Sequence, residues 1–143
     1  LQILMTSYTK KQNADIYFGT AEEKNLLATI QSKFGRNITQ SRHKYCLYDF
    51  SDDDTVIELK SRHMTHNYYP TAIIGENKIK CFRKKVDAGK KVYLLFNYTD
   101  GLFYVEYTGK DIWECKSINR RDRGKDEISN VYHIPYKCLT KIN

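Results

Sequence analysis

Two neighbouring segments near the middle of the chain are rich in apolar, β-prone residues and flank a short polar run. The segments are residues 45–50 and 55–59, and the run between them, residues 51–54, reads Ser-Asp-Asp-Asp. Apolar runs of this length on either side of turn-forming residues are typical of a β-hairpin. The pattern therefore predicts two antiparallel strands that are joined at residues 51–54.

The side chains of the second strand fall into two groups, because alternate residues of a strand face opposite sides of a sheet. Val56, Glu58 and Lys60 share one face, whereas Ile57 and Leu59 share the other. Aliphatic residues on both faces predict a central strand that is covered on each side. A glutamate and a lysine inside such a strand require a chemical explanation.

Asp49 ends the first strand, and its parity places it near Glu58 across the hairpin. Two adjacent carboxylates bind hard cations such as Mg²⁺, whose octahedral shell is completed by water and phosphate oxygens. Such an ion polarises a phosphoryl oxygen and activates a bound water, and an ammonium such as that of Lys60 can orient the water or neutralise developing charge. The simpler alternative is a surface hairpin whose salt bridge contributes less than about 1 kcal/mol. Asp54 also shares the parity of Glu58 and is the reserve for Asp49.

The apolar spacing of residues 20–35 predicts an amphipathic helix. Thr20 is a suitable N-cap, and Glu23, three residues further on, completes a capping box. Gly35 is a suitable stop. The apolar stripe consists of Leu26, Leu27, Ile30 and Phe34. Glu23 can serve as a capping residue alone, or it can lie near the buried face of the helix and contribute to a site.

Further patterns alternate helix and strand through the rest of the chain. Residues 76–89 predict a second helix, in which basic residues surround one apolar face. Residues 91–98 and 102–107 predict a hairpin around an Asp-Gly turn. Shorter predicted elements are strands at 38–40 and 131–134 and a helix that begins at Pro135. This order indicates an α/β (α+β) domain, and the glycine fingerprint of dinucleotide-binding folds is missing.

Asp49 and the triplet Glu58-Leu59-Lys60 together resemble the D…(D/E)xK signature of the PD-(D/E)xK nuclease superfamily. Tyr48 stands where the family name has proline, a position that is often not proline in the family. The helix that carries Glu23 resembles the glutamate-bearing helix of the Holliday-junction-resolvase-like branch. The composition, rich in Lys, Asn, Ile and Tyr, suggests a viral or phage source.

The resemblance implies a restriction-endonuclease-like αβββαβ core, with a mixed central sheet flanked by helices, in a single nuclease-like domain over residues 1–143. It implies a metal-dependent nuclease that hydrolyses phosphodiester bonds in DNA. Asp49 and Glu58 would bind Mg²⁺, for which Mn²⁺ can substitute, Lys60 would orient or activate the attacking water, and Glu23 would support the ion or its water shell. Endonuclease, exonuclease and junction-resolvase activities all stay open. The alternative is a catalytically inactive nucleic-acid-binding domain of the same fold.

The triplet E-x-K is weak evidence by itself because it occurs four times, beginning at Glu22, Glu58, Glu76 and Glu114. Only Glu58 combines an aliphatic strand, an aspartate nine positions earlier and a glutamate on an upstream helix. The triplet at Glu114 is the one rival, since residues 111–113 could also form a strand, but it has no aspartate on a preceding strand.

Basic and aromatic residues outside the hairpin supply candidate DNA contacts, and the net charge of +7 suits a polyanionic partner. In the loop after Lys60, Arg62 is a candidate for phosphate contact, and Tyr68 and Tyr69 are candidates for base stacking. Lys78, in the first turn of the second helix, is a candidate by resemblance. The segment 116–125 is predicted to be a loop that either grips phosphates or merely connects, and it adds Arg120, Arg121 and Arg123.

The cysteines and histidines give no second metal site. The four cysteines are widely spaced, and His63 and His66 lack a third ligand. Two of the cysteines lie in apolar runs, as buried reduced thiols do, so we expect a reducing intracellular compartment, cytoplasmic or nuclear, without disulfides. No apolar run approaches transmembrane length, so no membrane association is expected. Resolvases and many restriction enzymes act as symmetric dimers, which leaves a homodimer open.

Overall fold

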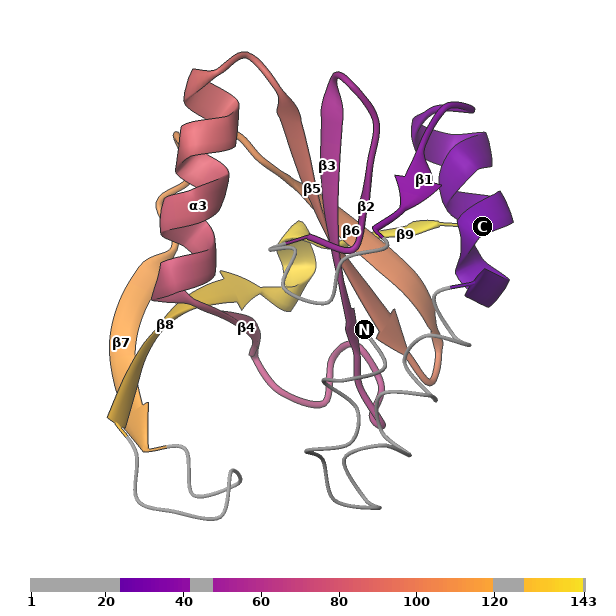
Figure 1. The fold of residues 1–143 in the computed structure, drawn as a ribbon. Coiled ribbons are helices and arrows are strands. Elements are labelled where there is room, and N and C mark those ends of the chain that lie inside the picture. Colours follow the sequence, from indigo (N-terminus) through magenta and orange to yellow (C-terminus); the bar gives the residue numbers. More distant parts are fainter. Residues whose placement is uncertain (1–23, 42–47, 120–127, 143) are drawn as a thin grey trace, which may run out of the picture.

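Two β-sheets and two helical segments make up the fold in the computed structural model, which describes residues 24–41, 48–119 and 128–142 (Figure 1). The larger, six-stranded sheet has the strand order β1-β2-β3-β5-β6-β9, and the smaller, three-stranded sheet has the order β4-β8-β7. The larger sheet consists of β1 (Thr39–Gln40), β2 (Phe50–Ser51), β3 (Thr55–Ser61), β5 (Lys91–Tyr98), β6 (Gly101–Tyr107) and β9 (Thr140–Ile142). The smaller sheet consists of β4 (Thr71–Gly75), β7 (Glu114–Asn119) and β8 (Ile128–Pro135). The helical segments are residues 24–34 and α3 (Glu76–Asp87), and a 3-10 turn, η2 (Tyr136–Cys138), precedes β9.

The predicted hairpin around residues 51–54 is confirmed. Strands β2 and β3 are antiparallel, with Phe50 opposite Ile57. In the turn, the backbone N–H of Asp54 donates to the side chain of Asp52 at 2.8 Å, and the side chain of Asp54 is exposed to solvent. Residues 45–47 of the predicted first strand lie outside the described residues. Asp54 therefore belongs to the exposed turn that directly precedes the buried part of β3.

Strand β3 occupies the centre of the larger sheet, as its apolar residues on both faces predicted. It pairs with β2 on one side and runs parallel to β5 on the other. Parallel neighbours need a crossover connection, and α3 lies in that connection. The helix 24–34, then β1, β2, β3, α3 and β5, gives the predicted αβββαβ order, with β4 inserted before α3.

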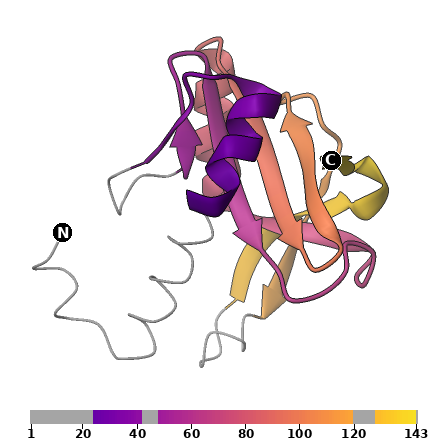
Figure 2. The same ribbon diagram turned by 90° about the vertical axis from the view of Figure 1, so that its right-hand side faces the viewer.

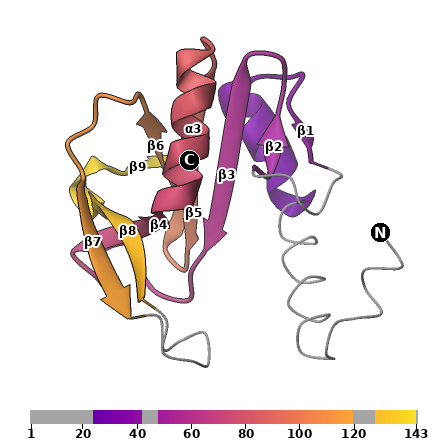
Figure 3. The same cartoon turned by 60° about the vertical axis from the view of Figure 1, so that its left-hand side comes forward.

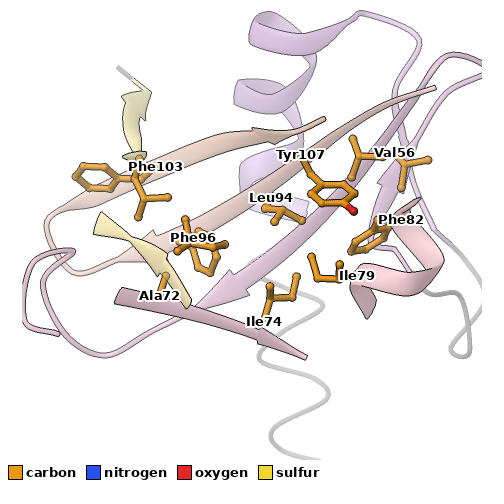
Figure 4. Packing of buried hydrophobic residues seen from close by; sticks show 12 residues of the cluster. Val56, Ala72, Ile74, Ile79, Phe82, Leu94, Phe96, Phe103 and Tyr107 are labelled. Carbon is orange, nitrogen blue, oxygen red and sulfur yellow. The ribbon is translucent and has the colours of Figure 1, made fainter. Parts of the chain in front are cut away.

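The two faces of β3 are covered by different layers. Figure 2 shows the helix 24–34 across one face of the larger sheet, where its predicted apolar stripe packs with Ile57 and Leu95. On the opposite face, α3 contacts β5, β4 and β8, and Figure 3 shows it between β3 and the smaller sheet. Val56 and Leu94 point into this second core (Figure 4). The alternation of faces along β3 therefore separates two cores, and Glu58 shares the α3 side with Val56 because both have the same parity.

Both predicted helices end where their glycines indicated. Ile79 and Phe82 of α3 are buried, and the helix stops before Gly89, whose φ of 86° suits glycine. Its N–H donates to the carbonyl of Val86 at 2.9 Å. The first helix stops before Gly35, and the proposed cap at Thr20 and Glu23 lies outside the described residues.

One prediction about the second half of the chain was wrong, and two were correct in place but differ in detail. Residues 116–119, predicted to be a loop, lie in β7, which is exposed along nearly all its length and is held by backbone pairing with β8. The short helix predicted to begin at Pro135 is present as the 3-10 helix η2, and Pro135 itself ends β8 and caps this helix. The predicted hairpin is confirmed as β5 and β6, but its turn is Thr99–Asp100, since Gly101 already pairs with Tyr98. Strands β4 and β9 were not predicted.

The expectation of buried cysteines was also wrong for the cysteines that the structure describes. Cys115 and Cys138 are exposed and Cys81 is half-buried, because these positions lie on outer surfaces of α3, β7 and η2. All three are free thiols. Among the described residues, no helix is long and apolar enough to cross a membrane.

A core substitution tests this architecture. Leu94 of β5 is 1% exposed in the core beneath α3, whereas Ile112 is 97% exposed. Leu94→Ala is expected to lower the free energy of unfolding by about 3 kcal/mol, because it removes buried apolar surface and leaves a cavity. Ile112→Ala is expected to change it by less than about 0.5 kcal/mol. Urea unfolding of both variants checks this, and equal losses would contradict the assignment of the core.

Candidate active site

Glu58 is a buried acidic residue in the centre of β3. It is 3% exposed and, with Thr55, makes up the buried polar residues of the described chain. Its neighbour on the parallel strand is Leu94, and Val56 lies two residues before it on the same face. A carboxylate is costly in such surroundings unless charged or hydrogen-bonding partners compensate. The partners of Glu58 therefore define the site.

Asp49 is one of these partners. It stands immediately before β2, where its N–H donates to the carbonyl of Ile57 at 2.9 Å. Its Oδ2 accepts a hydrogen bond of 2.7 Å from the N–H of Leu59. These bonds fix the Asp49 carboxyl beside β3, and the Asp49 and Glu58 carboxyls are close enough to share a hydrogen bond. The structure thus brings together the two acidic residues that the parity of the hairpin suggested.

Two lysines face Glu58 from different elements. Lys78 Nζ, from the first turn of α3, lies 2.7 Å from Glu58 Oε2. Lys60 Nζ, from β3 itself, lies 3.9 Å from Glu58 Oε1. Both lysine side chains keep about a third of their surface exposed, at 32% and 31%. The four side chains form a cluster with two acidic and two basic groups at the edge of the core.

The electrostatics of this cluster follow from its burial. Burial and, to a smaller extent, the adjacent Asp49 carboxyl raise the pKa of Glu58 to about 7, against the opposing effect of the Lys60 and Lys78 charges. Burial lowers the pKa of Lys60, which the charge of Glu58 partly offsets. Glu58 consequently exchanges its proton near neutral pH, and its ionisation depends strongly on nearby cations.

The donor set of this cluster fits a hard divalent cation. The buried Glu58 carboxyl lies beside the half-buried Asp49 carboxyl, and positive charge relieves their mutual repulsion. Asp49 and Glu58 would hold such an ion. Within the described residues no group of three or more His, Cys, Asp and Glu side chains gathers at one point. Remaining ligands would then be water, phosphate or groups such as Glu23, which lies outside the described residues.

The rival E-x-K triplets have different surroundings. Glu114 and Lys116 form a pair at 2.8 Å on β7, with 68% and 63% of their side chains exposed. Glu76 pairs with Lys80 at 3.0 Å along α3, where the Lys80 side chain is 66% exposed and that of Glu76 is 27% exposed. Exposed pairs of this kind contribute little and need no function. Of the triplets whose glutamates are described, only the one at Glu58 places its glutamate in the core.

The loop after β3 presents the predicted aromatic residues at the surface. Tyr68 and Tyr69 are 67% and 56% exposed, and their rings contact each other at 4.8 Å between centroids, edge to face. Arg62, at the start of this loop, is half-buried, and its N–H donates to the carbonyl of Asn97 at 2.9 Å. Arg120, Arg121 and Arg123 lie outside the described residues.

His66 and Asp100 fasten this loop to the β5–β6 turn, a contact that sequence reasoning missed. His66 Nδ1 lies 2.6 Å from Asp100 Oδ2, and the His66 N–H donates to Asp100 Oδ1 at 2.9 Å. The His66 ring stacks on Phe103 at 4.3 Å. Although burial alone would raise it, the pKa of Asp100 is lowered by its hydrogen bonds to His66. No local pattern marks a contact between residues 34 positions apart.

The order of elements and the carboxylate–lysine cluster on β3 define a nuclease-like domain of the PD-(D/E)xK superfamily with a restriction-endonuclease-like fold. Residues 7–142 match the family described as "Phage putative PDDEXK endonuclease", and the chain belongs to that family. No curated protein shows a significant match to the chain.

The raised pKa of Glu58 predicts how stability depends on pH. Because folding raises this pKa from 4.5 to about 7, the folded state retains a proton that the unfolded state has released. The free energy of unfolding should therefore fall between about pH 4.5 and pH 7, by about 3 kcal/mol from this group. Urea unfolding in EDTA of the wild type and of Glu58→Gln, from pH 4.5 to 8, isolates this contribution. Parallel pH profiles for the two proteins would contradict it.

Proposed function

We propose that this chain forms a single nuclease-like domain that hydrolyses phosphodiester bonds in DNA with the help of Mg²⁺, for which Mn²⁺ can substitute. The observation that carries the proposal is the buried Glu58 carboxyl, placed beside Asp49 and within reach of Lys60. A structural ion pair would not need a second carboxyl, that of the half-buried Asp49, beside the buried one. Membership of the endonuclease family supports the same assignment.

Each residue of the cluster has a distinct role in this proposal. Asp49 and Glu58 bind the divalent ion, which supplies charge stabilisation for the phosphoryl group and an activated water when bound. The backbone hydrogen bond from Leu59 holds the Asp49 carboxyl in place for that task. Glu23, outside the described residues, supports the ion or its water shell.

Lys60 orients the attacking water or neutralises the charge that develops on the phosphate. Its side chain keeps 31% of its surface exposed, so substrate can reach it, and it shares a face of β3 with Glu58. The lowered pKa of Lys60 makes the ammonium a better proton donor than a lysine in water. Proton release to the departing oxygen of the cleaved bond is therefore within its chemistry.

The surface around the cluster suits a DNA strand. Tyr68 and Tyr69 offer exposed rings for base stacking, and the loop that carries them is fastened by the His66–Asp100 contact. Arg62, at the start of that loop, and Lys78, beside Glu58, add positive charge for contacts with the phosphate backbone. Further contacts are assigned to Arg120, Arg121 and Arg123. A homodimer would present two such surfaces to one duplex.

Matched substitutions of two E-x-K triplets test the catalytic assignment. Glu58→Gln and Lys60→Met are each expected to lower Mg²⁺-dependent cleavage of DNA about 100-fold or more, because each removes a group that acts on the reacting phosphate. Glu114→Gln and Lys116→Met make the same changes in the exposed pair on β7 and should leave cleavage unchanged. Linear, circular and branched DNA serve as substrates, with EDTA as the blank.

The substrates also separate the possible activities. Cutting of circular DNA indicates an endonuclease, loss from linear ends alone indicates an exonuclease, and preference for branched DNA indicates a resolvase. Cleavage that survives Glu58→Gln would refute the proposed site. Salt-sensitive DNA binding without cleavage by the wild type would favour the catalytically inactive binding domain instead.

The aromatic pair generates a separate prediction about binding. Tyr68→Ala and Tyr69→Ala are each expected to weaken the binding of single-stranded DNA by about tenfold, since a stacked base contributes on the order of 1–3 kcal/mol. Ile112→Ala removes an even more exposed hydrophobic side chain elsewhere and serves as the control. Fluorescence anisotropy in EDTA measures binding without cleavage. Unchanged affinities would remove the tyrosines from the DNA surface.

A further inference from the structure

Lys78 makes the shortest contact to the Glu58 carboxyl that the structure records. Its Nζ lies 2.7 Å from Oε2, whereas the other lysine of the cluster, Lys60, is 3.9 Å from Oε1. The Glu58 side chain is 4% exposed and that of Lys78 is 32% exposed. The contact therefore joins an almost inaccessible carboxylate to a long side chain that still reaches solvent.

This contact and a bound metal ion compete for the same oxygen. Mg²⁺ binds carboxylate oxygens at about 2.0–2.1 Å and requires a nearly octahedral shell. An ammonium at 2.7 Å from that oxygen would occupy part of the shell and repel the ion. An ion that takes Glu58 Oε2 as a ligand must therefore displace the ammonium or bind against its positive charge.

Lys78 can leave without disturbing the fold. It stands in the first turn of α3, next to Ile79, and the buried residues of that helix are Ile79 and Phe82. These apolar side chains hold α3 against the sheet, so the helix does not depend on the ammonium for its position. The four-carbon stem of a lysine has enough freedom to turn its charge toward solvent.

We propose that Lys78 is an exchangeable cation: it holds the Glu58 carboxylate, is displaced when a divalent ion binds, and so sets the ion concentration that the site requires. This inference rests on the proposed function, because it takes Glu58 as a metal ligand. It assigns Lys78 a positioning role through Glu58, in addition to the DNA contact suggested by its place in α3. The displaced ammonium remains near the ion, where it can pair with a negatively charged substrate phosphate.

Lysine acylation of the wild-type protein tests the exchange directly. Acetic anhydride modifies free amines, and mass spectrometry reads the extent at each lysine. Lys78 should react slowly in EDTA and faster in Mg²⁺ at the same pH, because the ion frees its amine from Glu58. Lys80, which pairs with Glu76 at 3.0 Å on the same helix, should react equally in both conditions.

Metal affinity supplies the second readout. Lys78→Met is expected to bind Mn²⁺ about tenfold more tightly than the wild type, because the ion no longer has to break a charge-assisted hydrogen bond. Lys80→Met removes the same charge from α3 and should change the affinity far less, since Lys80 pairs with Glu76 and not with Asp49 or Glu58. Titration calorimetry without DNA gives the Mn²⁺ dissociation constant of each protein. Lys78→Arg keeps the charge and should bind Mn²⁺ no more tightly than the wild type.

The outcomes distinguish this inference from the function on which it rests. If Mg²⁺ raises the melting temperature but leaves Lys78 acylation unchanged, the exchange is wrong and the metal site stands. Equal Mn²⁺ affinities of the wild type and Lys78→Met would also overturn it. If the divalent ions neither bind nor support cleavage, the proposed function fails, and the exchange fails with it.

Discussion

The candidate site at the centre of this molecule depends on the burial of the Glu58 carboxyl. Removing an ionised carboxylate from water costs several kcal/mol unless nearby groups compensate. The structure places Asp49, Lys60 and Lys78 next to the Glu58 carboxyl. The arrangement stabilises the carboxyl only in part, because burial still raises its pKa to about 7. The site is therefore poised to accept a positive charge.

The fold holds these groups together through its two-sided central strand. The helix 24–34 covers one face of β3, and α3 covers the other and brings Lys78 to the carboxyl. The parallel pairing with β5 requires the crossover in which α3 lies. Backbone bonds to β3 fix Asp49 before β2 begins. Rigid elements thus position every described group of the site, as precise catalytic geometry requires.

Sequence patterns predicted the parts of this fold that repeat with a regular period. The alternation along residues 55–60 gave the central strand and the shared face of Glu58 and Lys60, and the helical stripe gave α3. Strand β7 was missed because it is polar on both faces and depends on pairing with β8. The ion pair between Lys78 and Glu58 joins residues 20 positions apart through the crossover, so no local pattern could show it. The His66–Asp100 contact was missed for the same reason.

The most direct test of the central claim is to locate the bound ion along the chain. Fe²⁺ replaces Mg²⁺ in many oxygen-ligand sites and, with ascorbate and peroxide, generates radicals that cut the polypeptide next to the ion. Mass spectrometry of the fragments should find cuts near Asp49 and Glu58, and excess Mg²⁺ should suppress them. Cuts clustered at another part of the chain, or cuts that Mg²⁺ does not suppress, would contradict the assignment of the metal to these two carboxylates.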